Sequence, residues 1–172
     1  MEVDTSKSNR MLSMNTLGFT ISFMVWLMYG MLINYLTKTI EVDGQIINGL
    51  IPELKGWEFF LSSIPILTGS IMRMPIGILT DKYGGRPVFT GVLLLSSLGA
   101  LMASFSTTLT AFIIAGLTFG MAGTAFAVGI AYSSIWFSKK KQGFALGIFG
   151  AGNAGAALTA ILAPRLLKSL TG

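Results

Sequence analysis

The sequence of 172 residues contains no cysteine and no histidine. The first absence excludes disulfides and thiolate chemistry, and the second excludes imidazole metal ligands and histidine acid–base catalysis. No nucleophile–base pair or cluster of metal-ligating side chains stands out in the remaining sequence. We therefore expect no enzymatic activity, with no catalytic residues, no metal and no cofactor.

Charged residues are also scarce, at 11% of the chain, whereas soluble domains carry about a quarter. Hydrophobic residues reach 52% and the mean hydropathy is +0.72, values typical of an integral membrane protein. The net charge of +5 would suggest a nucleic-acid partner for a soluble protein. In a membrane protein basic residues orient the helices instead, so we expect a lipid bilayer and no nucleic acid as partner.

Acidic residues are the scarcest charged groups, and all seven fall in an N-terminal tail, in one loop or at a helix end. They are Glu2, Asp4, Glu41, Asp43, Glu53, Glu58 and Asp81. No acid therefore remains inside the apolar segments to neutralise a buried cation. This shortage matters because one arginine lies within such a segment.

Arg73 interrupts the long apolar run 61–88 and precedes Asp81 by eight residues. A helix rises about 1.5 Å per residue, so Arg73 lies about 12 Å inside the membrane if Asp81 marks the water boundary. That depth is near the middle of a bilayer core of about 30 Å, where a charge normally has a partner. The partner is either a small anionic substrate held by the guanidinium group, or backbone carbonyls or an acid elsewhere that make Arg73 structural.

The apolar runs predict an all-α membrane protein with a polar tail over residues 1–15 and a bundle over residues 16–172. Five membrane helices are expected over about residues 17–36, 57–79, 88–105, 109–137 and 143–167. A polar loop joins the first two helices, and Pro65 and Pro75 are expected to bend the second.

Lysine and arginine gather on one side of this predicted bundle. The tail and the second and fourth links carry Lys7, Arg10, Lys82, Arg86, Lys139, Lys140 and Lys141, and the opposite side has Lys38, Lys55, Arg165 and Lys168. The positive-inside rule then predicts a multi-pass protein of the cell (inner) membrane with a cytoplasmic N-terminus.

The link between the second and third helices reads GILTDKYGGR and includes Gly77, Asp81, Lys82, Gly84 and Arg86. We expect Gly77 to allow close helix contact, Asp81 to pair with Arg86 or accept from helix N-termini, and Gly84 to form a tight turn. This spacing resembles the conserved loop between helices two and three of the major facilitator superfamily.

The fifth predicted helix carries small residues spaced by four, a pattern that favours close helix packing. They are Gly143, Gly147, Ala151 and Gly155. Asn153 lies between glycines, including Gly152, and a membrane-buried amide can donate a hydrogen bond to an anion.

The glycine-rich string 147–155, together with Arg73, resembles the nitrate/nitrite porter family within that superfamily. The resemblance implies that Arg73 and Asn153 hold the anion, with Gly152 beside them and Phe126 as an aromatic flank. It also implies that the five helices form most of the N-terminal six-helix half of a major facilitator fold. The C-terminal half would then be a missing partner.

The expected function is therefore secondary transport of nitrate and nitrite by alternating access, as in nitrate assimilation. Two alternatives stay open: a carrier for another small anion or organic acid, and a non-transporting sensor or assembly subunit in which Arg73 is structural. Because no carboxylate or histidine lies inside the helices to carry a proton, the sequence favours anion exchange over proton symport.

Overall fold

The computed structural model describes residues 5–38, 40–42, 45–47 and 50–171 of the chain. Within these residues, five helical segments are long and apolar enough to cross a membrane, which confirms the predicted all-α membrane fold. The segments are Ser6–Thr37, Glu58–Tyr83, Gly85–Phe105, Leu109–Ile135 and Lys139–Leu166. We call them the first to fifth spans.

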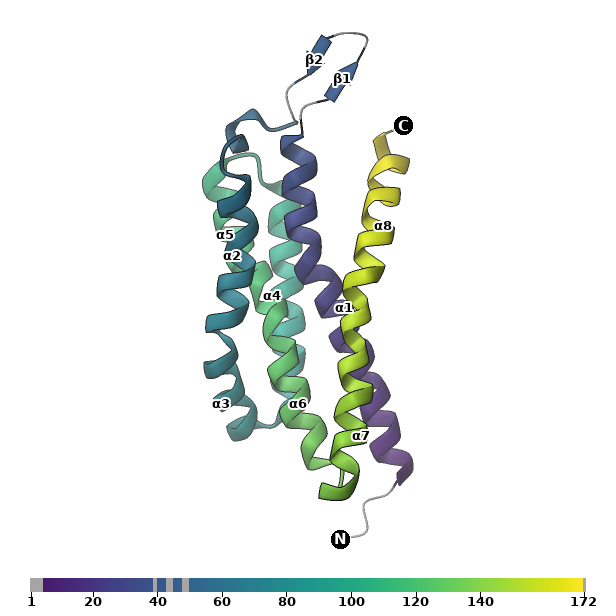
Figure 1. The fold of residues 1–172 in the computed structure, drawn as a ribbon. Coiled ribbons are helices and arrows are strands. Elements are labelled where there is room, and N and C mark those ends of the chain that lie inside the picture. Colours follow the sequence, from purple (N-terminus) through teal and green to yellow (C-terminus); the bar gives the residue numbers. More distant parts are fainter. Residues whose placement is uncertain (1–4, 39, 43–44, 48–49, 172) are drawn as a thin grey trace.

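The spans alternate in direction, so that the N-terminus and the links after the second and fourth spans lie at one end of the bundle (Figure 1). The helices are α1 (Thr5–Thr37), α2 (Glu58–Ile71), α3 (Arg73–Tyr83), α4 (Gly85–Phe105), α5 (Leu109–Phe119), α6 (Ala125–Ile135), α7 (Lys139–Gly150) and α8 (Ala154–Thr171). Three short 3₁₀ segments are η1 (Pro52–Leu54), η2 (Gly120–Thr124) and η3 (Ala151–Asn153).

The first helix begins at Thr5, so the expected polar tail over residues 1–15 is largely helical. Two of its polar side chains, those of Ser8 and Asn15, bond to the fourth span or the residue just after it. The Asn15 amide donates to the Gly129 carbonyl at 3.0 Å and to the Ser133 hydroxyl at 2.6 Å, and the Ser8 hydroxyl donates to the Trp136 carbonyl at 3.2 Å. Such contacts between distant residues leave no signal in local composition.

The loop after the first span contains a small antiparallel hairpin in addition to the expected turns. Strands β1 (Ile40–Val42) and β2 (Gln45–Ile47) pair with Ile40 opposite Ile47. The segment η1 follows, and its Leu54 side chain is buried against the bundle. These elements lie at the end of the bundle opposite the N-terminus (Figure 1).

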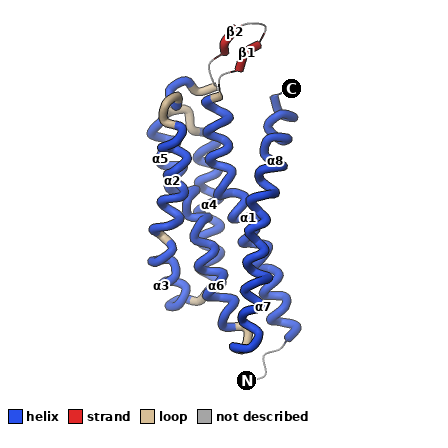
Figure 2. The backbone as a smooth tube through the Cα atoms, in the orientation of Figure 1, coloured by secondary structure: helices blue, strands red, loops and turns tan. Residues whose placement is uncertain are grey.

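Three of the five spans are interrupted near their middle. The break in the second span falls at Met72, and Figure 2 shows it as a short loop between α2 and α3. Pro75 explains its place, because a proline has no N–H to donate to the carbonyl of Ile71, the last residue of α2. Pro65 lies inside α2 and does not end it, whereas η2 and η3 interrupt the fourth and fifth spans.

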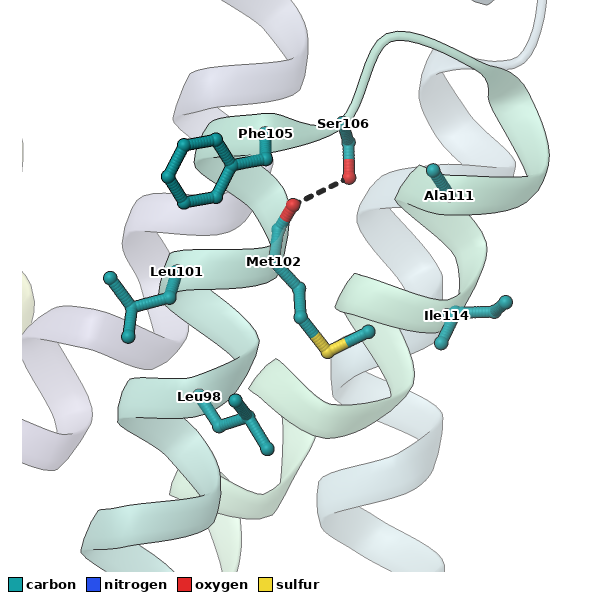
Figure 3. A pocket seen from close by; sticks show the side chains of 7 residues that line it. All are labelled: Leu98, Leu101, Met102, Phe105, Ser106, Ala111 and Ile114. Carbon is teal, nitrogen blue, oxygen red and sulfur yellow. Dashed lines mark hydrogen bonds between the residues drawn. The ribbon is translucent and has the colours of Figure 1, made fainter.

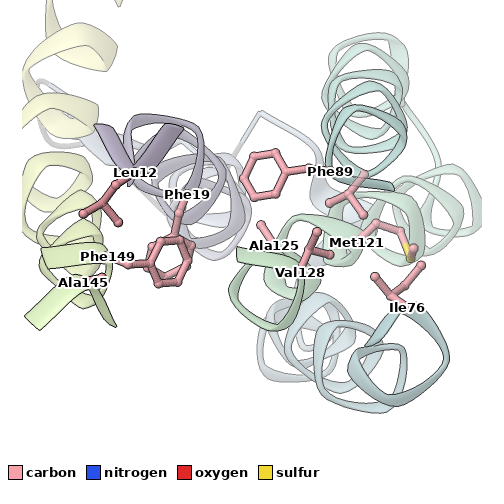
Figure 4. Close-up of a cluster of buried hydrophobic side chains, with 10 residues drawn as sticks. Leu12, Phe19, Ile76, Phe89, Met121, Ala125, Val128, Ala145 and Phe149 are labelled. Carbon is pink, nitrogen blue, oxygen red and sulfur yellow. The ribbon is translucent and has the colours of Figure 1, made fainter. Parts of the chain in front are cut away.

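Two clusters of buried apolar side chains hold the bundle together. The first cluster, drawn in Figure 4, joins α1, α3, α4, η2, α6 and α7 through Leu12, Phe19, Ile76, Phe89, Val92, Met121, Ala125, Val128, Ala145 and Phe149. The second cluster lies nearer the hairpin and includes Tyr29, Leu61 and Phe112. Arg73 borders the first cluster through its partly buried member Phe126.

Glycines bring the second and fourth spans unusually close together. A Cβ atom placed on Gly120 would lie 2.8 Å from the Pro65 carbonyl oxygen, and one on Gly69 would lie 2.9 Å from the Gly120 carbonyl oxygen. The hydrophobic effect does not drive helices together within a membrane, because lipid tails are as apolar as leucine. Small residues favour association there because they let two helix backbones pack closely. The contact between α2 and η2 that these glycines allow lies directly beside Arg73.

Candidate functional site

Arg73 is the first residue of α3 and is half-buried in the bundle. The guanidinium Nε–H donates to the carbonyl oxygen of Gly123 in η2 at 3.3 Å. A carbonyl has two lone pairs, so this oxygen can accept from Arg73 as well as from its own backbone. The break between α2 and α3 and the 3₁₀ segment of the fourth span thus meet at the arginine.

Two aromatic rings flank the Arg73 guanidinium group. Its Cζ atom lies 5.8 Å from the ring centroid of Trp26 in α1 and 5.8 Å from that of Phe126 in α6. Cations are attracted to aromatic faces at this distance, by about 0.5–2 kcal/mol depending on desolvation. The structure therefore brings together Arg73 and Phe126, two of the residues that the sequence singled out.

Among the described residues, no carboxylate forms an ion pair with Arg73. Asp81 is exposed in the last turn of α3, and Glu53 and Glu58 lie at the other end of the second span. Only the Nε position has a hydrogen-bond acceptor in the described part of the chain, namely one neutral carbonyl. The edge of the guanidinium formed by its two terminal amino groups remains available to an anion.

Asn153 and Gly152 lie in η3, the break in the fifth span. Asn153 is exposed, and its amide donates to the Gly150 carbonyl at 2.9 Å within the same helical turn. Gly152 is buried, and a Cβ atom there would lie 2.5 Å from Cδ1 of Phe19. No contact among the described residues joins Asn153 to Arg73 or Phe126.

Stacked aromatic rings connect these two parts of the site. Phe19 lies 5.5 Å from Phe126 and 4.7 Å from Phe149 between ring centroids, and it packs on Gly152. Figure 4 shows Phe19 and Phe149 directly over one another. The path from Arg73 to Gly152 therefore passes through Phe126 and Phe19 rather than through polar groups.

The small-residue stripe on the fifth span contacts the first span at one of its four positions. Gly155 does contact the first span, because a Cβ atom there would overlap the Thr20 carbonyl. Gly143 and Gly147 have nothing within 4 Å of a Cβ position and Ala151 is exposed, so the described residues supply no packing partner for these three. The 3₁₀ turn η3 has about three residues per turn, so it rotates the residues before it away from the face that carries Gly155.

The loop motif turns the chain from α3 to α4 at Gly84. Gly84 has φ +85°, a conformation that favours glycine, and links α3 to α4. Asp81 and Arg86 are both exposed and form no ion pair in the described part of the chain, and Gly77 has nothing within 4 Å of a Cβ position. Lys82 instead lies 5.2 Å from the ring centroid of Tyr83.

Two cavities in the bundle are lined by residues other than Arg73. One of about 480 Å³ is apolar and lies between α4 and α5; Figure 3 shows its lining, with the Ser106 hydroxyl donating to the Met102 carbonyl at 2.7 Å. The other, of about 600 Å³, lies between α1 and α4 and is lined in part by Lys7, Arg10 and Arg86. Arg73 lines neither of these two cavities.

Sequence reasoning missed Trp26 and the Gly123 carbonyl. Tryptophans in membrane proteins gather at the two water interfaces, whereas Trp26 lies well inside the first span. That unusual position is the signal that could have identified it. The Gly123 carbonyl has no such signal, because backbone groups are freed by a helix break that composition does not show.

Comparisons with known proteins identify the family of the chain. The sequence profile of the Major Facilitator Superfamily matches residues 15–172. The chain is 40% identical over 161 residues to a "Probable nitrate/nitrite antiporter NarK1" of Thermus thermophilus, covering 94% of this chain and 34% of that protein. It is 30% identical over 159 residues to a "Nitrite extrusion protein" of Bacillus subtilis (strain 168), covering 92% of this chain and 38% of that protein.

A third relative is a "Probable nitrate transporter NarT" of Staphylococcus carnosus (strain TM300), which is 29% identical over 168 residues. That match covers 98% of this chain and 40% of the relative. The chain therefore spans between a third and two-fifths of the length of these three curated relatives.

Proposed function

Because this chain belongs to the Major Facilitator Superfamily, we propose that it forms part of a secondary transporter that carries nitrate and nitrite across a membrane. Carriers of this superfamily hold the substrate near the bilayer midplane between two halves, and they expose it alternately to each side. The five spans supply one side of such a site. The names of the relatives, which mention nitrate and nitrite, support this choice of substrate.

The observation that carries the proposal is that Arg73 has no acidic partner among the described residues. Its Nε position is taken by the Gly123 carbonyl, and the two flanking rings carry no charge. A planar anion with several equivalent oxygens can accept two parallel hydrogen bonds from the terminal amino groups. Nitrate and nitrite both have this shape, and the face of Phe126 is flat enough to pack against them.

Asn153 and Gly152 complete the proposed substrate contacts from the fifth span. The Asn153 side chain is exposed and bonds only to its own helical turn, so rotation about its side chain would free the amide for an anion. We place Asn153, together with the exposed Gly143, Gly147 and Ala151, on the face that meets the second half of the transporter. The loop-motif residues Gly77, Asp81 and Arg86 are proposed to contact the second half of the transporter as well, at the end of the bundle.

The proposed orientation puts the N-terminus in the cytoplasm and the protein in the cell (inner) membrane. The N-terminal end of the bundle carries Arg10, Lys82, Arg86 and the run of lysines at residues 139–141, whereas the opposite end carries fewer basic residues. This imbalance follows the positive-inside rule.

Anion exchange is the proposed mode of coupling. In the described part of the chain the carboxylates of the spans, Glu58 and Asp81, lie in a first and a last turn, and arginine stays charged at any working pH. A bare Arg73 is costly to move through the membrane, whereas one neutralised by nitrate in one direction and nitrite in the other is not.

The test replaces Arg73 with lysine in the whole natural transporter of which this chain is proposed to form part. It measures nitrate uptake into proteoliposomes loaded with nitrite. Lysine keeps the charge and loses the two-pronged edge, so we expect uptake efficiency to fall about 10- to 100-fold, the value of one or two charged hydrogen bonds. Arg165→Lys, at an exposed position of the fifth span, is the matched control and should leave uptake unchanged. Uptake by Arg73→Lys at the rate of the unchanged protein would contradict the proposed site.

The same vesicles test the mode of coupling. Exchange requires nitrite inside the vesicle and ignores an imposed pH gradient. Uptake into empty vesicles driven by inward protons would show that the coupling is symport instead.

A further inference from the structure

Trp26 lies in the middle of the first span and reaches across to the second. Its indole N–H donates to the Pro65 carbonyl at 3.0 Å, a bond between residues that are 39 positions apart. A buried or half-buried indole N–H usually finds such a partner, because leaving it unpaired in an apolar setting is costly. The bond fixes the ring at one edge.

The ring of Trp26 is also held by the backbone of two glycines. A Cβ atom on Gly123 would lie 2.8 Å from Cε2 of the indole, and one on Gly69 would lie 3.2 Å from Nε1. The ring therefore fills the space that side chains at these two positions would need. With one edge bonded and two sides against backbone, the indole has little freedom to turn.

Gly123 links this ring to Arg73. The indole packs against the α-carbon of Gly123, and the Gly123 carbonyl accepts a hydrogen bond from the Arg73 Nε–H at 3.3 Å. The guanidinium carbon lies 5.8 Å from the Trp26 ring centroid, at the same distance as from Phe126. Arg73 is thus fixed at three points, of which Trp26 forms one directly and supports a second through Gly123.

We propose that Trp26 is a positioning residue that holds the guanidinium plane of Arg73 so that its two terminal amino groups face the substrate anion. An arginine side chain has several rotatable bonds, and ordering it at the moment of binding would weaken binding. A ring that restricts the side chain beforehand removes part of that cost. The proposal rests on the proposed function, because it assigns Trp26 a role in holding the anion-binding arginine.

The first experiment measures KM and maximal rate for nitrate uptake in the natural protein with Trp26→Leu, Trp26→Phe and the control Trp57→Phe. Trp57 is exposed at the start of the second span, far along the bundle from Arg73. Loss of the ring in Trp26→Leu should raise KM about 3- to 30-fold. Trp26→Phe keeps an aromatic face but loses the bond to Pro65, so its KM should rise only about 2- to 3-fold.

A positioning role predicts that the maximal rate and the thermal unfolding midpoint of Trp26→Phe stay near those of the unchanged protein. An unchanged KM in both Trp26 variants, with Arg73→Lys still impaired, would overturn the inference while leaving the proposed function intact. If Arg73→Lys also transports nitrate normally, the proposed site itself is wrong.

A second measurement does not depend on transport and works even if Trp26→Leu fails to fold. Trp26 is kept as the single tryptophan by replacing every other one with phenylalanine, and its fluorescence is followed during nitrate addition in detergent. Nitrate quenches indole fluorescence on contact, so an anion on Arg73 should give quenching that saturates near KM. The same protein with Arg73→Lys should show only weak quenching that rises linearly. Linear quenching in both proteins would overturn the placement of Trp26 beside the bound anion.

Discussion

Gly120→Ala should destabilise the bundle although it adds only one methyl group. The new Cβ would lie 2.6 Å from Cβ of Thr68, 2.8 Å from the Pro65 carbonyl oxygen and 2.9 Å from its α-carbon. All three distances are shorter than real Cβ contacts, and two of the atoms belong to the backbone of α2, which cannot turn away as a long side chain would. The second and fourth spans must therefore move apart.

Overpacking of this kind costs about 1–3 kcal/mol of unfolding free energy. Gly91→Ala is the control, because Gly91 lies in a membrane helix with nothing within 4 Å of a Cβ position. Without a clash, alanine should stabilise that helix by up to about 1 kcal/mol through its higher helix propensity. We expect Gly120→Ala to be less stable than Gly91→Ala by about 1–4 kcal/mol, measured by unfolding in mixed micelles followed by circular dichroism. Equal stability of the two variants would refute the close crossing of α2 and η2.

Two further predictions concern contacts of the first span. Gly155→Leu should lower the unfolding free energy by at least about 2 kcal/mol, because its Cβ would overlap the Thr20 carbonyl. Gly147→Leu is the control and should leave the stability of the chain nearly unchanged, because nothing lies within 4 Å of its Cβ position. A larger loss of stability for Gly147→Leu in the same micelle assay would show that Gly147, rather than Gly155, faces the first span. Asn15→Ala removes two buried hydrogen bonds and should cost about 1–3 kcal/mol. Asn34→Ala, which removes one exposed bond within its own helix, should cost less than about 0.5 kcal/mol, and equal effects would argue against the polar link to the fourth span.

The sequence was informative where a single physical constraint dominates. Membrane thickness sets the length of each apolar run, so the number of spans could be predicted, and the cost of a buried charge made Arg73 conspicuous. The neighbourhood of Phe126 followed from the family resemblance rather than from spacing. The structure supports it with a ring centroid 5.8 Å from the guanidinium carbon.

Other features depend on contacts between residues far apart in the chain. The hydrogen bond of Asn15 reaches the fourth span, and the hairpin after the first span is too short to give a strand pattern. Within the stripe on the fifth span, Gly155 contacts the first span and Gly147 does not, because a 3₁₀ turn changes the helical period that the spacing argument assumes. Trp26 was overlooked because its role depends on Gly123 and Pro65, which lie on two other spans.

The bonds from Asn15 to the fourth span also set an order of events during synthesis. Gly129 follows Asn15 by 114 residues and Ser133 follows it by 118, so neither acceptor exists when the first span leaves the ribosome. At about 5–20 residues per second, the delay is on the order of ten seconds. During that time the Asn15 amide needs water, lipid headgroups or the insertion machinery as its partner. The two bonds that hold the N-terminal turns of the first span in the bundle can therefore form only after the fourth span has been delivered beside them.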